Sequence, residues 1–219
     1  MYDPTVADRV LGSAAIRRRQ ATARALARTL SHLDVEGLAN IPARGPVVLV
    51  MNHRAFVDGP VVFGFVRRPV TCLVKSEAFT PGLTPILRGA GQIPVRRDGR
   101  DYAAVRLCLR VLRGGGVVGV FPEGSRGNGL VETSRPGAAY LAMRTGAVIV
   151  PVAFHGTDEV GHGVRPRVQL VIGAPITVPV AEPGTRLNRR AVAAEAERVR
   201  AVHAALVAGS TPQGRSVAA

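Results

Sequence analysis

The chain contains no tryptophan, and all aromatic residues together make up only 4% of its 219 residues. Hydrophobic residues nevertheless make up 47% of the chain, which is enough to bury a full core and excludes wholesale disorder. A chain of this length is the size of one ordinary domain. The core must therefore consist mainly of valine, leucine, alanine and isoleucine.

Cysteines and long apolar runs are equally scarce. Cys72 and Cys108 are too few and too far apart for a disulfide framework, and no His, Cys or carboxylate cluster has metal-ligand spacing. We therefore expect no metal and no cofactor. No run of about 18 apolar residues could span a bilayer, and no leader with a cleavage site is visible. We expect the chain to act in the cytoplasm or on the cytoplasmic face of the cell membrane.

Acidic residues are few: 15 Asp and Glu stand against 29 Lys and Arg, giving a formal net charge of +14. Lys75 is the only lysine, so a general preference for arginine explains which basic residue is used. It does not explain the excess of basic residues. Such a chain should bind polyanions, which include nucleic acid, anionic lipid and phosphorylated substrates.

Residues 5–31 predict one long helix with a loose apolar stripe and six arginines beside or opposite it. Such a helix can lie on anionic lipid, or it can pack its apolar face on the domain and leave the arginines in solvent. We predict an N-terminal amphipathic helical segment over 1–33, a main domain over 34–208 and a disordered tail over 209–219.

The main domain alternates apolar strands with helices. Strands are predicted at 46–51, 70–74, 92–95, 117–121, 147–154 and 167–172, and helices at about 59–66, 82–89, 100–113, 135–145 and 188–208. Continuous apolar strands indicate burial on both faces of the sheet. The pattern predicts an α/β fold, a three-layer α/β/α sandwich with a central, mostly parallel mixed sheet.

Polar residues follow four consecutive predicted strands, at the edge where such sheets carry their chemistry. These residues are Asn52 with His53, the segment 75–77 with Lys75, Arg96 with Arg97, and the segment 122–126. His53 follows a buried strand, and Asp58 comes five residues later. A carboxylate at this spacing can fix the imidazole tautomer and raise its basicity. Alternatively, Asp58 only caps the following helix.

Four ordered motifs resemble those of the glycerolipid acyltransferases, typified by 1-acyl-glycerol-3-phosphate acyltransferase. NHRAFVDG resembles the NHxxxxD motif, and the stretch from VKSEAF to IPVRR resembles the next block. FPEGSRG is similar to the Phe-Pro-Glu-Gly-Thr-Arg block, and AVIVPVAFHG to the fourth motif. Together they cover about 46–156, which is half of the chain.

The resemblance implies that His53 is the general base and that Asp58 orients it. It implies an acceptor phosphate site formed by Arg97, Glu123, Gly124, Ser125 and Arg126, with Asn52, Lys75 and Arg135 as supporting residues. We expect Glu123 to orient Arg126 or a neighbouring backbone amide rather than to touch phosphate. No GxSxG segment is present, which argues against a serine hydrolase.

The implied reaction moves a fatty acyl group from acyl-CoA or acyl carrier protein to 1-acyl-glycerol 3-phosphate, giving phosphatidic acid at the membrane surface. Glycerol 3-phosphate, a lysophospholipid and a lyso-aminolipid stay open as acceptors. Arg135 stands where the family usually has lysine, which leaves the acceptor in doubt. A nucleic-acid-binding protein is the alternative from another class, although the chain lacks stacking aromatics in its strands and zinc ligands.

Overall fold

The computed structural model describes residues 14–96, 101–123, 129–133, 135–162, 165–182 and 184–210. Seven strands form one sheet in the order β1-β7-β6-β2-β5-β3-β4. Neighbouring strands are parallel except β6 and β7, which are antiparallel. The strands are β1 (His32–Glu36), β2 (Val47–Met51), β3 (Val70–Lys75), β4 (Ile93–Val95), β5 (Val117–Val120), β6 (Val148–His155) and β7 (Arg167–Ile172).

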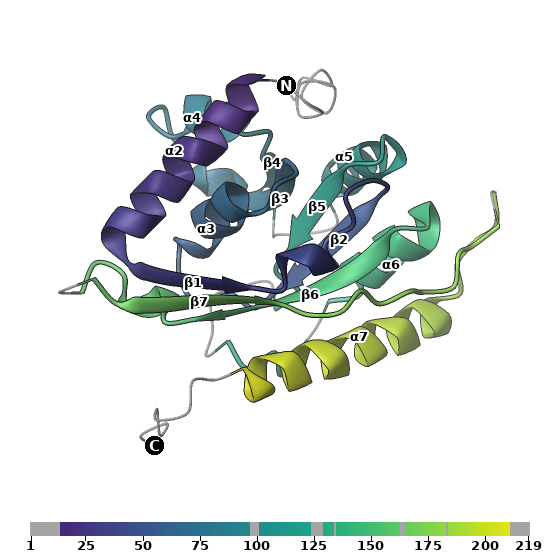
Figure 1. Cartoon of the computed structure of the whole chain (residues 1–219). Coiled ribbons are helices and arrows are strands. Elements are labelled where there is room, and N and C mark those ends of the chain that lie inside the picture. The colour runs from purple at the N-terminus through teal and green to yellow at the C-terminus, as the bar shows by residue number, and fades with distance from the viewer. Residues whose placement is uncertain are drawn as a thin grey trace.

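Helices cover both faces of this sheet (Figure 1). They are α2 (Ala14–Leu30), α3 (Asp58–Phe65), α4 (Thr84–Gly89), α5 (Tyr102–Arg113), α6 (Gly137–Thr145) and α7 (Arg189–Gly209), with short 3₁₀ turns at η1 (Leu38–Asn40), η2 (Ser76–Ala78) and η3 (Thr157–Glu159). The helices α2 and α3 lie on one face, and α5, α6 and α7 lie on the other. Within the described residues, no helix is both long enough and apolar enough to cross a membrane.

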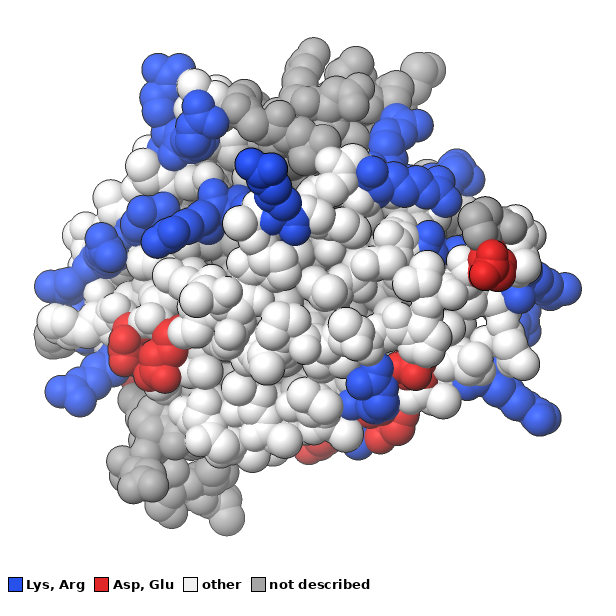
Figure 2. Space-filling view, turned by 45° about the vertical axis from the view of Figure 1, so that its right-hand side comes forward, with Lys and Arg blue, Asp and Glu red and all other residues white. Residues whose placement is uncertain are grey.

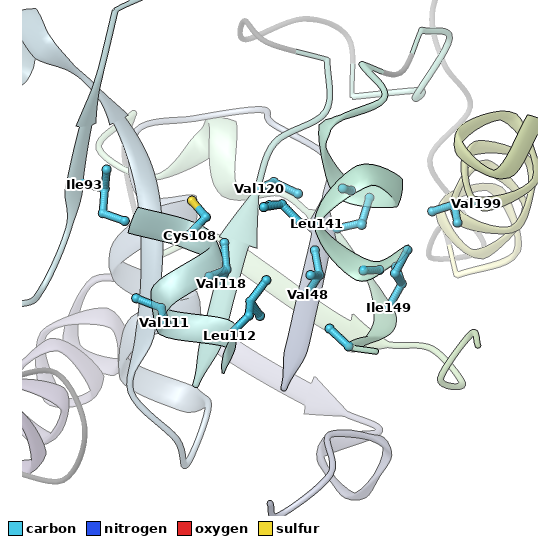
Figure 3. Close-up of a cluster of buried hydrophobic side chains, with 14 of the residues drawn as sticks. Val48, Ile93, Cys108, Val111, Leu112, Val118, Val120, Leu141, Ile149 and Val199 are labelled. Carbon is cyan, nitrogen blue, oxygen red and sulfur yellow. The ribbon is translucent and has the colours of Figure 1, made fainter. Parts of the chain in front are cut away.

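The core has two layers because successive side chains of a strand point to opposite faces. In β2, Val48 and Val50 pack with residues of α5, α6 and α7, whereas Leu49 and Met51 pack with residues of α3. Figure 3 shows the first layer, where Leu112, Leu141 and Val199 converge on the sheet from three helices. As the composition predicts, aliphatic side chains dominate both layers.

The predicted fold class is confirmed, and each predicted strand is found with bounds within a residue of those expected. The structure contains one further strand, β1, which the sequence did not predict. Its side chains alternate between exposed and half-buried, and it pairs with β7 at the edge of the sheet. The sequence HLDVE lacks the continuous apolar character by which the other strands were found.

The C-terminal helix α7 is fixed to the sheet by a buried histidine. The His203 side chain is fully buried, and its Nε2–H donates to the Val152 carbonyl of β6 at 2.9 Å. Its Nδ1 atom has no hydrogen-bond partner among the described residues. Burial lowers the pKa of His203 from 6.5 to about 4, so the imidazole stays neutral in the folded protein.

This burial predicts that the protein loses stability as the pH falls. The folded pKa of about 4 lies below the unfolded value of 6.5, so between these values the unfolded chain binds a proton that the folded chain does not. The free energy of unfolding should fall by up to about 3 kcal/mol across this window. His203→Gln keeps a donor for Val152 but does not titrate. Urea denaturation from pH 7 to pH 4.5 should give a flatter profile for this variant; equal slopes would contradict the prediction.

Candidate active site

Four parallel strands deliver their carboxyl ends to one edge of the sheet, as predicted. They lie in the order β2, β5, β3 and β4, so the segments that follow β2 and β5 are direct neighbours. Lys75 ends β3, one strand further away, and Arg96 follows the edge strand β4; both side chains are exposed. The residues nearest to one another at this edge are therefore those that follow β2 and β5.

Asp58 is the first residue of α3, and its carboxylate is fully buried. Its Oδ2 atom accepts hydrogen bonds from the backbone N–H groups of Arg54 at 2.8 Å and Ala55 at 2.9 Å. The same oxygen lies 2.8 Å from Nδ1 of His53. The loop between the two residues is thus folded around this oxygen.

His53 points one ring nitrogen at Asp58. Because a carboxylate accepts, Nδ1 carries the proton in the neutral ring, and Nε2 keeps a lone pair. The ring lies against Phe121, with centroids 4.3 Å apart, and 16% of the His53 side chain is exposed. The imidazole is therefore held from two sides, yet it is open to a small reacting group. This is the geometry of a general base oriented by a carboxylate.

Asn52 joins this loop to the sheet. Its backbone follows the last residue of β2, and its buried side chain continues the pairing with β6. Oδ1 accepts from the backbone N–H of Phe154 at 2.7 Å, and Nδ2 donates to the Phe154 carbonyl at 3.0 Å. The amide thus replaces the main-chain bonds of a further strand residue, which frees the backbone to turn toward His53. Nδ2 also donates to the Gly129 carbonyl at 3.2 Å.

Glu123 follows β5 and contacts the loop between β2 and α3, which carries His53. Its Oε1 atom accepts from the backbone N–H of His53 at 3.3 Å. Burial raises the pKa of Glu123, while the hydrogen bond from His53 acts in the opposite direction. A backbone amide was one of the two partners expected for this residue. The contact ties the start of the third motif, FPEGSRG, to the backbone of His53.

Arg54 ties the same loop to the turn after β6. Its guanidinium forms two hydrogen bonds of 3.0 Å to the carboxylate of Asp158 in η3, which raises the pKa of Arg54. The stem of Arg54 lies against Gly129, which has a φ of +72°. A Cβ atom at Gly129 would lie 2.8 Å from Cγ of Arg54, so only glycine fits there.

The backbone stays unusual beyond Gly129. Val131 has a φ of +57°, which is rare for a β-branched residue, and its side chain is fully buried beside Ala153 and Val207. The Val131 carbonyl accepts from Arg200 of α7 at 3.2 Å. Packing on α7 and β6 thus holds a strained backbone next to the site, where such strain is commonly found.

The remaining candidates divide into two groups. Arg135 is exposed, and its backbone N–H donates to the Pro122 carbonyl at 3.0 Å, which brings it to the end of β5. Arg97, Gly124, Ser125 and Arg126 lie outside the described residues. Among the residues that the structure does describe, no group of three or more His, Cys, Asp or Glu side chains could hold a metal ion.

Comparison with known families bears on this geometry. A family model described as Acyltransferase matches residues 32–155, which is more than half of the chain. The chain belongs to the acyltransferase family. The matched segment begins at β1 and ends at the last residue of β6, so it includes His53, Asp58 and Glu123.

Two curated relatives match a similar stretch of this acyltransferase. The 1-acyl-sn-glycerol-3-phosphate acyltransferase of Borreliella burgdorferi is 33% identical over 57% of this chain and 52% of its own length. A chloroplastic 1-acyl-sn-glycerol-3-phosphate acyltransferase of Arabidopsis thaliana is 30% identical over 58% of this chain and 37% of its own length. The chain therefore spans about half or less of these relatives.

A solved structure extends the likeness to most of the fold. The 1-acyl-sn-glycerophosphate (LPA) acyltransferase from Thermotoga maritima aligns with a TM-score of 0.66 at 22% identity. The alignment covers 91% of this chain and 81% of that one. At this identity the likeness establishes the fold of the acyltransferase and not its substrate.

Sequence reasoning missed two contacts of the site. Phe121 was predicted as the end of a strand, yet its ring lies on His53. The second missed contact joins Arg54, to which the sequence assigned no role, with Asp158, which lies 104 residues further along the chain. The charge of Arg54 was the local signal for this ion pair, but nothing in the motif indicated the partner.

We expect Asn52 to be required for turnover beyond its effect on stability. Asn52→Leu keeps the volume but leaves the polar backbone groups of Phe154 and Gly129 without this partner, which should cost about 1–3 kcal/mol of stability. Loss of these hydrogen bonds between Asn52 and β6 should also displace His53 and lower the turnover number about tenfold or more. Thermal unfolding and turnover per folded molecule are the measurements.

Asn40 offers a matched control for this variant. Its Nδ2 atom donates to the Ile172 carbonyl of β7 at 2.8 Å, and β7 lies two strands from β2 in the sheet. Asn40→Leu should lower stability but keep turnover per folded molecule. Equal turnover losses in the two variants would show that Asn52 has no special role in the site.

Proposed function

We propose that this acyltransferase moves a fatty acyl group from an acyl thioester to the free hydroxyl of 1-acyl-glycerol 3-phosphate, which gives phosphatidic acid. The observation that carries the proposal is the pairing of His53 with the buried Asp58, beside the strand that leads into FPEGSRG. The names of the Borreliella and Arabidopsis relatives support the same acceptor.

The proposed mechanism needs no protein nucleophile. Nε2 of His53 takes the proton of the acceptor hydroxyl as its oxygen attacks the thioester carbonyl, while Asp58 stabilises the imidazolium. When the tetrahedral intermediate collapses, the carbon–sulfur bond breaks, and the leaving thiolate takes the proton from the imidazolium. The products are the ester and the free thiol of coenzyme A or acyl carrier protein.

Arg126 and Arg97 are proposed as the cations that bind the acceptor phosphate, because a guanidinium can offer two parallel hydrogen bonds to phosphate. Gly124 and Ser125 would let the backbone and a hydroxyl approach the ligand, and Arg135 and Lys75 would add charge nearby. Arg97 follows β4, which lies two strands, or roughly 10 Å, from β5. Arg126, which follows β5, is therefore the better candidate for direct contact.

We propose a peripheral position on the cytoplasmic face of an anionic membrane, because both acceptor and product are lipids. Two leucines of the predicted stripe, Leu26 and Leu30, are 57% and 45% exposed on α2. Arg17, Arg18 and Arg28 are exposed on the same helix. Figure 2 shows a row of basic side chains across the upper left of one face, with acidic ones sparse around it. Each such charge contributes up to about 1 kcal/mol near an anionic surface.

The first expected outcome concerns the base. His53→Ala should lower turnover by about 10²–10⁴-fold, and Asp58→Asn should also lower it strongly because the wrong tautomer is favoured. His32→Ala, which removes an exposed histidine of β1, is the control and should keep full activity. A folded His53→Ala enzyme with near-normal turnover would refute the mechanism.

The assay should use purified protein, acyl-CoA and acyl carrier protein as donors, and mass spectrometry of the products. The acceptors are 1-acyl-glycerol 3-phosphate, glycerol 3-phosphate, a lysophospholipid and a lyso-aminolipid. Phosphatidic acid as the main product supports the proposal, and preference for another acceptor would redirect it. Salt-dependent binding of DNA or RNA without any acyl transfer would favour the nucleic-acid alternative.

A second expected outcome concerns the phosphate. Arg126→Ala removes a charge-assisted contact and should raise the acceptor KM by roughly 30- to 150-fold, or about 2–3 kcal/mol, with a smaller effect on the donor KM. Arg97→Ala should have a weaker effect in the same direction. Arg113→Ala, at the exposed end of α5, is the matched control. An unchanged acceptor KM in both site variants would locate phosphate binding elsewhere.

A further inference from the structure

The face of α2 that packs on the protein shares Ile16 with the apolar stripe expected from the sequence, whereas Leu26 and Leu30 of that stripe are exposed. Its buried residues are Ile16 and Gln20, and Ala23 and Ala27 are partly buried beyond them. This face lies on α3 (Figure 1). A glutamine that is 3% exposed at the centre of a helix–helix contact needs hydrogen-bond partners.

Gln20 finds these partners at the C-terminal end of α3. Its side-chain NH₂ group lies 3.1 Å from the carbonyl of Phe63, 3.0 Å from that of Val66 and 3.2 Å from that of Arg68. The last carbonyls of a helix have no partner within the helix, so they must be satisfied from outside. Two N–H donors shared among three carbonyls supply this cap for α3.

Two further contacts hold α2 in register with α3. Nε of Arg24 donates to the Gly64 carbonyl at 3.0 Å, and the guanidinium carbon lies 5.8 Å from the Phe65 ring centroid. A Cβ atom at Gly64 would lie 2.9 Å from the backbone nitrogen of Arg24, so the two backbones meet closely at a glycine. Movement of α2 therefore displaces the end of α3.

The other end of α3 is Asp58. The helix has eight residues and is about 12 Å long, so it can act as a rigid rod of two turns. At its first residue, Asp58 holds Nδ1 of His53, and at its last turn Gln20 holds the terminal carbonyls. The path from α2 to the base passes through this one short helix.

We infer that Gln20 is a positioning residue for the His53–Asp58 pair, so that α2 aligns the catalytic centre in addition to any contact it makes with the membrane. The inference rests on the proposed function of the pair. An anchor affects only how the enzyme reaches a lipid. A positioning element also affects turnover of an acceptor that is dissolved in water.

The test compares Gln20→Met with Arg19→Met. Methionine keeps the length of the glutamine side chain but donates no hydrogen bond. Arg19 is on the same helix and donates to the Gly89 carbonyl at the end of α4 instead, and methionine removes this hydrogen bond too. Each variant is assayed with a short-chain, water-soluble 1-acyl-glycerol 3-phosphate, per molecule folded by circular dichroism. Gln20→Met should lower kcat by about ten- to a hundred-fold with little change in donor KM. Arg19→Met should keep the kcat of the wild type.

The pH–rate profile separates positioning from simple stability. A weaker contact between Asp58 and His53 stabilises the imidazolium less, so the acid limb of Gln20→Met should move to lower pH. Lower thermal stability with unchanged kcat and an unchanged profile would overturn the inference. If wild-type protein does not turn over this acceptor, the proposed acceptor fails instead, and the variants are compared on whichever acceptor wild type uses.

Vesicles give the complementary measurement. Wild type, Gln20→Met and Arg19→Met are sedimented with vesicles of neutral and of anionic phospholipid at low and high salt. Gln20→Met should bind the anionic vesicles like wild type, because Gln20 faces α3 and not solvent. Arg19→Met lacks one exposed charge of α2 and should bind them somewhat more weakly. A Gln20→Met enzyme that loses vesicle binding but keeps kcat on the dissolved acceptor would make α2 an anchor only.

Discussion

The carboxylate of Asp58 is fully removed from solvent, and a charge in that position is stable only where donors surround it. Two backbone N–H groups and the His53 imidazole surround one of its oxygens, Oδ2, while Oδ1 has no hydrogen-bond partner among the described residues. The loop must therefore turn tightly between the two residues, and α3 must begin where it does. The remaining contacts of the site, through Asn52, Arg54 and Glu123, hold the loop in this shape against three different parts of the sheet edge.

Much of this arrangement could be predicted because its signals are local. Strands such as VVLVM are apolar throughout, and only a strand covered on both faces needs that composition. Because His53 and Asp58 are only five residues apart, a single tight turn of the backbone is enough to bring their side chains into contact. Together with the order of the four motifs, these features predict the parallel strands and the edge at which the reactive groups meet.

The contacts that escaped prediction join residues far apart in the sequence. Gln20 sits in a helix whose apolar stripe suggested another buried face, and only its partners in and beyond α3 explain its burial. The position of β3 between β5 and β4 is a property of the whole sheet, and it separates the end of β4 from the end of β5. Propensity and spacing describe neighbours along the chain, whereas strand order depends on pairings between distant segments.

The pairing of β1 with β7 bears on the order in which the chain can fold during synthesis. Asn40, just after β1, donates to the Ile172 carbonyl at the end of β7, 132 residues later. Gln20 of α2 meets its partners only 43 to 48 residues along the chain. On the ribosome, α2 can therefore dock on α3 while β1 still lacks its neighbour. The growing polypeptide must carry an open strand edge until most of the protein has emerged, and such edges are where nascent chains aggregate. In β1, exposed polar side chains alternate with half-buried apolar ones along HLDVE. The unpaired edge strand is therefore not uniformly hydrophobic before β7 is synthesised.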